Sequence, residues 1–207
     1  MNCRLTFTAS FTDVVHFHGH RCPGLALGYR ASGIALHELG ATRSEDEELV
    51  CIVENDACGV DAVQYLTGCT LGKGNLILRC YGKNVYTFIN RKTGDAVRIV
   101  QRTDFSTRRI DSRAGDLRQR VMAGTATPEE QEEYRERIDH VIAMILQIPP
   151  EGIFTIRHVH MPVPETARIF TSIPCARCGE LVAEPLTRVH EGRIVCIPCS
   201  EAAKGGR

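Results

Sequence analysis

Residues 49–76 read LVCIVENDACGVDAVQYLTGCTLGKGNL. The apolar run 49–55 predicts a short buried strand, and the segment 59–67 predicts a helix. The loop 68–75 contains three glycines, which allow positive φ angles and a close approach of the backbone to a ligand. Reactive side chains between a central strand and the next helix are typical of sites in layered α/β structures. This stretch therefore predicts part of the fold together with one wall of a site.

Helices and strands are predicted on both sides of this stretch. Helices are expected over 10–18, from Pro23 to Gly40, and over 104–122 and 127–147, with extended segments over 75–82, 84–91, 96–102 and 152–164. The strands between 75 and 102 are joined by short turns, which predicts a three-stranded antiparallel meander. We predict an α+β fold. Residues 1–165 form a mixed α/β domain with an antiparallel sheet and packed helices, and residues 170–207 form a small second domain.

The second domain carries two CxxC pairs in the runs CARCGE and CIPCS. Cys175 and Cys178 form the first pair, and Cys196 and Cys199 form the second. Two such knuckles supply the four thiolates of a structural Zn²⁺ site of the zinc-ribbon or treble-clef type. The alternative is a disulfide or a redox pair, but a single CxxC would serve that chemistry and the second pair would stay unexplained. We predict a structural zinc ion here.

A second group of metal-ligating side chains lies in FHGHRCPGLALGYR, residues 17–30. His18, His20 and Cys22 alternate across a turn that leads into a helix N-terminus, where free N–H groups favour a thiolate. The alternative is that histidines near a helix end are simply polar surface residues. We prefer a functional role for these three residues, and not for His16, which lies one helical turn earlier.

The stretch quoted first adds further candidates. Asp56 and Cys58 follow the central strand, and Cys58 starts a helix as Cys22 does, so both thiols are expected to have lowered pKa values. Lys73 offers a positive charge in the glycine loop. We predict catalytic roles for His20, Cys22, Asp56, Cys58 and Lys73, metal ligands at His18, Cys22 and Cys58, and cofactor contacts at Cys69, Gly72, Lys73 and Gly74. Cys51 and Cys80 lie in apolar strand runs and are expected to be structural thiols.

These motifs resemble the FmdE family of formylmethanofuran dehydrogenase subunits. The resemblance extends over nearly the whole chain. It is carried by Phe17, His18, Gly19, His20, Cys22, Pro23, Gly24, Gly28, Cys58, Asp61, Gly68, Cys69, Thr70, Gly72, Lys73 and Gly74.

The resemblance implies an N-terminal α+β domain with a metal-binding active site, a C-terminal zinc-ribbon or treble-clef domain, and a homodimer. The family is named for a molybdenum or tungsten enzyme that fixes CO₂ onto methanofuran in methanogenesis. We therefore expect a link to one-carbon or molybdenum-type redox metabolism, with such an oxidoreductase as a partner.

The first functional hypothesis is a metalloenzyme or a component of one. His18, Cys22 and Cys58 would bind Zn²⁺, Ni²⁺ or Fe²⁺, because imidazole and thiolate ligands disfavour Mg²⁺ and Ca²⁺. With one open position, the metal would activate water or polarise a carbonyl of a small one-carbon or pterin-like substrate. Asp56 or His20 would move the proton.

Two other hypotheses stay open. In one, the zinc domain docks an oxidoreductase or a nucleic acid and the protein has no catalysis of its own. In the other, Cys22, Cys58 and Cys69 perform thiol redox chemistry without a metal. His158 and His160 share one face of an expected strand, but we regard them as ordinary strand residues.

Composition limits the partners and the compartment. Lys plus Arg and Asp plus Glu number 25 each, so no global field attracts nucleic acid or an anionic membrane, and a nucleic-acid partner is not expected. No apolar stretch reaches the ~20 residues needed to span a bilayer. The start MNCRLTFTASF lacks the features of a signal peptide, so we expect a cytoplasmic protein with reduced thiols.

Overall fold

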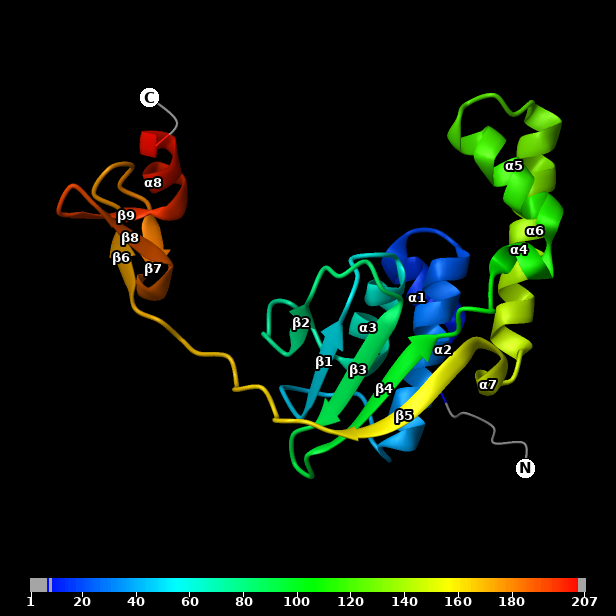
Figure 1. Cartoon of the computed structure of the whole chain (residues 1–207), viewed down its shortest axis with the longest axis horizontal. Coiled ribbons are helices and arrows are strands. Elements are labelled where there is room, and N and C mark those ends of the chain that lie inside the picture. Colours follow the sequence, from blue (N-terminus) through cyan, green and yellow to red (C-terminus); the bar gives the residue numbers. More distant parts are fainter. Residues whose placement is uncertain (1–6, 8, 205–207) are drawn as a thin grey trace. The chain divides into compact units, whose positions relative to one another are not determined.

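The computed structural model describes residues 7 and 9–204. The chain divides into two compact units, Met1–Thr166 and Ala167–Arg207 (Figure 1). The first unit combines helices with a mixed sheet, and the second contains two small hairpins, a helix and a four-cysteine cluster that is compatible with a zinc ribbon. The predicted α+β class is confirmed.

The first unit is built on one five-stranded sheet. Its strands are β1 (Leu49–Val53), β2 (Leu76–Leu78), β3 (Val85–Asn90), β4 (Asp95–Gln101) and β5 (Phe154–His160). They lie in the order β2-β1-β3-β4-β5, with β2 parallel to β1 and the other neighbours antiparallel. Because β1 has a strand on each side, all five of its residues are buried.

The predicted meander is wrong at its first strand, since β2 pairs with β1 and not with β3. The helix between β1 and β2 carries the chain back across the sheet, so β2 enters parallel to β1. After β2, the amides of Tyr81 and Lys83 both donate to the carbonyl of Glu54, which leads the chain past the end of β1. Of the three strands of the predicted meander, β3 and β4 form a hairpin, with Gly94 at φ 77° in the connection.

The helices of this unit are α1 (Phe11–His18), α2 (Pro23–Glu38), α3 (Gly59–Thr67), α4 (Thr107–Ile110), α5 (Ser112–Met122), α6 (Pro128–Gln147) and α7 (Pro150–Ile153). The main core lies where α2, α3 and α6 pack against one face of the sheet. Ile34 of α2, Val63 of α3 and Ile142 of α6 meet Phe88 and Val97 of the strands there. Helix α5 runs beside α6 (Figure 1), and the residues that α6 contributes to the core lie near its C-terminal end.

Two glycines allow α2 and α3 to lie unusually close together. A Cβ atom on Gly28 would stand 2.2 Å from the carbonyl oxygen of Gly59. A Cβ atom on Gly59 would stand 2.4 Å from the hydroxyl of Tyr86. A side chain at position 28 would force the two helices apart, and one at position 59 would collide with the hydroxyl of Tyr86 on β3. This contact brings the N-terminus of α2, which begins after Cys22, next to the N-terminus of α3, which begins after Cys58.

The second unit consists of short elements around a small core. They are β6 (Ser172–Pro174), β7 (Leu181–Ala183), the 3₁₀ turn η1 (Glu184–Leu186), β8 (Thr187–His190), β9 (Arg193–Cys196) and α8 (Ile197–Lys204). β6 pairs with β7 and β8 with β9, both antiparallel. Its buried cluster consists of Cys175, Val195 and Cys196. So small a core contributes little hydrophobic stabilisation on its own.

Within the described part of the chain, none of the helices combines the length and the hydropathy that a membrane span requires.

Candidate metal centre

The turn between α1 and α2 positions three of the candidate ligands. Ser10 caps α1 and exchanges hydrogen bonds with Asp13 in a capping box. Gly19, at φ 94°, ends that helix directly after His18. Two residues beyond His20, Cys22 caps α2, where its Sγ accepts a hydrogen bond from the amide of Leu25 at 3.3 Å. The residues that cap α1 and α2 are therefore adjacent in sequence to the candidate ligands and place them at the facing ends of these two helices.

Four side chains converge at this point. The ligand atoms of His18, His20, Cys22 and Cys58 all lie within 4.8 Å of one another. The Nε2 atom of His18 lies 4.0 Å from the Sγ of Cys22. Cys58 stands at the N-cap of α3 and makes no side-chain capping bond, which leaves its thiol available to the cluster. The structure thus gathers residues that are far apart in the sequence.

Asp61 orients one of the imidazoles. Its Oδ2 lies 2.7 Å from the Nδ1 of His18, whose side chain is only 10% exposed. A carboxylate on one ring nitrogen fixes the tautomer and leaves the other nitrogen free for coordination, as in many metal sites. Asp61 follows Cys58 by three residues, and this spacing places both on one face of α3.

The pKa of the Cys22 thiol is raised, whereas the sequence predicts that it is lowered. Burial raises its pKa to about 11, and the Leu25 amide only partly offsets this. The predicted lowering by the helix N-terminus is therefore outweighed by desolvation, and the neighbouring Cys58 thiol is a further cause of the rise. Two imidazoles and two thiols still form a donor set that fits Zn²⁺, Ni²⁺ or Fe²⁺.

A cavity of about 350 Å³ adjoins the cluster. It is lined by His18, Val53, Asp56, Ala57, Cys58, Val60, Asp61, Gln64, Leu71, Leu76 and Leu78. Most of its wall is apolar, and the polar groups come from the end of α1, from the segment after β1 and from α3. This is the composition of a small-molecule pocket.

The four C-terminal cysteines also converge. The Sγ atoms of Cys175, Cys178, Cys196 and Cys199 lie within 4.8 Å of one another. The Cys175 sulfur accepts the amides of Arg177 at 3.4 Å and Cys196 at 3.3 Å. Backbone N–H groups, that of Cys178 foremost, lower the pKa of Cys175 to about 6. A thiolate stabilised in this way, with three further sulfurs beside it, fits a structural zinc ion.

Comparison with known proteins accounts for the N-terminal arrangement. The family model described as "FmdE, Molybdenum formylmethanofuran dehydrogenase operon" matches residues 17–155. The chain belongs to the FmdE family. The matched region contains the His/Cys cluster and its pocket, whereas the four-cysteine unit lies beyond it. Family membership together with these clusters supports a metal-binding FmdE-like protein.

Two relatives extend the comparison. A protein of Archaeoglobus fulgidus named a probable S-adenosyl-L-methionine-binding protein is 36% identical over 189 residues, covering 89% of this chain. This chain spans 50% of that relative's length. The crystal structure of a tungsten formylmethanofuran dehydrogenase FmdE-like protein from Syntrophus aciditrophicus superposes with a TM-score of 0.63, covering 95% of each chain at 21% identity. At that identity the likeness concerns the fold.

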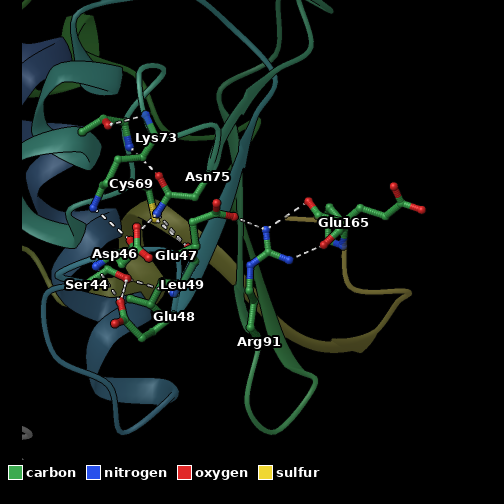
Figure 2. A network of polar contacts seen from close by, with 12 residues as sticks. Ser44, Asp46, Glu47, Glu48, Leu49, Cys69, Lys73, Asn75, Arg91 and Glu165 are labelled. Atoms are coloured by element: carbon green, nitrogen blue, oxygen red, sulfur yellow. Dashed lines mark hydrogen bonds and ion pairs between the residues drawn. The ribbon is translucent and has the colours of Figure 1, made fainter. Parts of the chain in front are cut away.

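The glycine loop of this FmdE-family chain is fastened to the segment before β1 (Figure 2). The ammonium of Lys73 donates to the carbonyls of Glu45 and Asp46, at 3.1 and 2.9 Å. Asn75 is fully buried and donates to the carbonyls of Asp46 and Leu49. Of this loop, only Leu71 lines the cavity, and Lys73, Cys69, Gly72 and Gly74 do not.

The remaining candidates lie in separate places. Cys69 is buried, and its Sγ is 3.5 Å from the carbonyl of Leu49. His158 pairs with Glu38 at 2.9 Å on the outside of the first unit. Asp56 is exposed and lines the cavity. His16 is exposed and outside the cluster.

Sequence reasoning gave Asp61 no role of its own beyond its place in the family motif. Its spacing from Cys58 was the available signal. The contributions of Gln64 and Leu71 to the cavity depend on tertiary packing and have no comparable local signal.

Proposed function

We propose that this FmdE-family protein binds a transition metal through His18, Cys22 and Cys58, with His20 as a fourth ligand or a proton donor. It would act as a metalloenzyme, or as a component of one, on a small molecule held in the adjoining pocket. The observation that carries this proposal is the convergence of four ligand atoms within 4.8 Å beside a cavity of about 350 Å³.

A bound metal of this class supplies Lewis acidity toward a carbonyl group or a water molecule. The protein's own groups have separate tasks. Asp61 fixes the ring of His18 from behind, and the apolar wall formed by Val53, Leu76 and other residues excludes water. Asp56 borders the same cavity, where its carboxylate would accept or return a proton.

The cavity also limits the substrate. Among the described residues that line it there is no lysine or arginine, while Asp56 and Asp61 contribute carboxylates. An anionic group would be repelled there, whereas a neutral or cationic body with N–H donors would be accepted. A compact one-carbon carrier or a pterin-like heterocycle fits this description.

We infer a link to one-carbon redox metabolism from the family. The family model's description names a molybdenum formylmethanofuran dehydrogenase operon, which supports a molybdenum or tungsten oxidoreductase as a partner. Assembly as a homodimer is part of this proposal and rests on the family resemblance.

A second candidate is an accessory protein without catalysis, whose zinc unit docks such an oxidoreductase. One observation favours it. Val189 and Ile194 face each other across the β8–β9 hairpin and are 77% and 45% exposed. An exposed apolar pair on a hairpin is a common element of protein interfaces.

The deciding experiment is elemental analysis of protein purified without chelators or metal-affinity resin. The wild type is expected to carry two metals per chain and Cys58→Ser one. Cys80→Ser is the matched control, because Cys80 lies after the end of β2 and is an exposed thiol outside both clusters, not the structural strand thiol that the sequence predicts. One zinc per chain in wild type and Cys58→Ser alike would overturn the N-terminal site and favour the accessory function.

A further inference from the structure

The C-terminal unit contains a cavity of its own, of about 320 Å³. It is lined by Arg177, His190, Glu191, Arg193, Val195 and Cys199. Arg177 comes from the first CxxC knuckle, Cys199 from the second, and the other four from the β8–β9 hairpin. The cavity is thus built by the parts of the unit that the four-cysteine cluster holds together.

The hairpin geometry places two of these side chains together. His190 and Arg193 are partners in the register of β8 and β9, so their side chains emerge on the same face. The two residues between them form the tight turn, with Glu191 at φ 51° and Gly192 at φ 74°. Val195 lies two residues beyond Arg193 on the same face and forms the floor.

The cationic groups around the cavity are mostly unsatisfied. Among the described residues, the side chains of Arg193 and His190 make no hydrogen bond or ion pair. The guanidinium of Arg177 makes one, from Nη1 to the carbonyl of Cys199 at 2.8 Å, which orients it and leaves its other donors free. Hydrogen-bond donors from Arg177, His190 and Arg193 therefore border one cavity.

We propose that this cavity binds the phosphoryl group of a small molecule. Two guanidinium groups and an imidazole, presented from separate positions, match the three terminal oxygens of a phosphoryl dianion better than the two oxygens of a carboxylate. Glu191 is the one carboxylate among the described lining residues, and two guanidinium groups stand against it. Of the same residues only His190 carries an aromatic ring, so the cavity lacks a platform for stacking bases.

This site is independent of the proposed N-terminal metal and of its substrate. The ligand chemistry is shared by free phosphate and by phosphate esters, and the volume leaves room for a sugar-sized body beyond the phosphoryl group. Free phosphate and a phosphate ester can be distinguished by whether the organic group of the ester increases the affinity.

The test is isothermal titration of the full chain with ribose 5-phosphate and with inorganic phosphate. Arg193→Gln is expected to weaken binding of ribose 5-phosphate at least tenfold. Arg188→Gln is the matched control, because Arg188 belongs to the same hairpin but donates to the carbonyl of Thr187 and does not line the cavity. Glu191→Gln removes the opposing carboxylate and is expected to tighten binding.

The fold of each variant is followed by its zinc content, which must stay at the wild-type level. Tighter binding of ribose 5-phosphate than of phosphate would support a phosphate ester as the ligand, and equal binding would support the free anion. No binding of either at millimolar concentration would overturn the proposal. The proposal would also be overturned if Arg193→Gln bound ribose 5-phosphate as tightly as the wild type, or if the wild type bound malonate as tightly as phosphate.

Discussion

The Nδ1 of His18 and the Oδ2 of Asp61 lie 2.7 Å apart, joining the last residue of α1 to the first turn of α3. The contact turns the other ring nitrogen of His18 toward Cys22, at 4.0 Å from its sulfur. One hydrogen bond thus couples the packing of two helices to the direction of a metal ligand.

Asp61→Asn should weaken metal binding at the N-terminal site by about 10- to 100-fold, because a neutral amide orients the imidazole less firmly and lowers its basicity. A competition titration against a chromophoric chelator measures this. Metal binding by the four-cysteine cluster should be unaffected. Asp95→Asn, at the start of β4 and exposed, should bind like the wild type. Equal affinity in Asp61→Asn and wild type would remove the orienting role.

Gly28→Ala should destabilise the first unit by about 1–3 kcal/mol, since the new Cβ would stand 2.2 Å from the Gly59 oxygen. Alanine favours a helix by about 1 kcal/mol over glycine, but the opposing atoms are backbone and cannot rotate away. The N-terminal metal should be lost as well, because the two helices begin at Cys22 and Cys58.

Urea denaturation with metal analysis of the folded protein measures both effects of this substitution. Gly72→Ala is the control, because a Cβ atom there meets nothing within 4 Å and its φ is not in the left-handed region. If Gly28→Ala matched Gly72→Ala in stability and in metal content, the close helix contact would not be needed.

Local signals explain the parts of the fold that were predicted correctly. Ser10 and Gly19 mark the two ends of α1, and the capping box of Thr127 and Glu130 marks the start of α6. These ends are predictable because the residues that hydrogen-bond the free backbone groups are adjacent in sequence. Strand pairing has no such signal. β2 was assigned to β3, its nearest neighbour in sequence, although it pairs with β1 across the intervening helix.

The site was predictable to a similar extent. The thiol and imidazole types, with their positions at helix ends, identified His18, His20, Cys22 and Cys58 as candidates. Lys73 was selected for its charge, yet its ammonium binds the carbonyls of the segment before β1. A sequence pattern reports which groups a loop carries, whereas backbone hydrogen bonds decide where those groups point.

The stability of the first unit should fall as the pH rises from about 9 to 11, and the buried thiol of Cys69 should be one cause of this decline beside that of Cys22. Burial raises its pKa to about 11, above the ordinary 9.0 that it regains on unfolding. Below pH 9 the thiol is protonated in both states. Above pH 9 only the unfolded chain releases the proton, which favours unfolding by up to about 2–3 kcal/mol at pH 11.

Urea denaturation across this range should show a shallower decline for Cys69→Ala than for the wild type. The variant is less stable at pH 8, so the two curves should converge as the pH rises. Cys80→Ala should follow the wild type, since the side chain of Cys80 is exposed and lies outside the core. Parallel curves for Cys69→Ala and wild type would contradict the assignment to Cys69.

The C-terminal unit should unfold when the metal proposed for its four-cysteine cluster is removed. Its buried cluster consists of Cys175, Val195 and Cys196, and two of these three residues belong to the proposed zinc site. Binding of zinc to four thiolates contributes folding free energy directly in domains of this size. The first unit has a core of many buried side chains from helices and sheet, and it should remain folded.

Two-dimensional amide NMR distinguishes the two units within the full chain. In Cys199→Ser, resonances of residues 167–204 should collapse to random-coil positions while those of the sheet stay dispersed. In Cys58→Ser, the resonances of the C-terminal unit should stay in place. Chemical-shift changes should be confined to the turn around His18 and to the start of α3. Dispersed resonances for β8 and β9 in Cys199→Ser would show that the hairpin holds without the fourth sulfur. The unit would then owe its fold to its own packing and not to zinc.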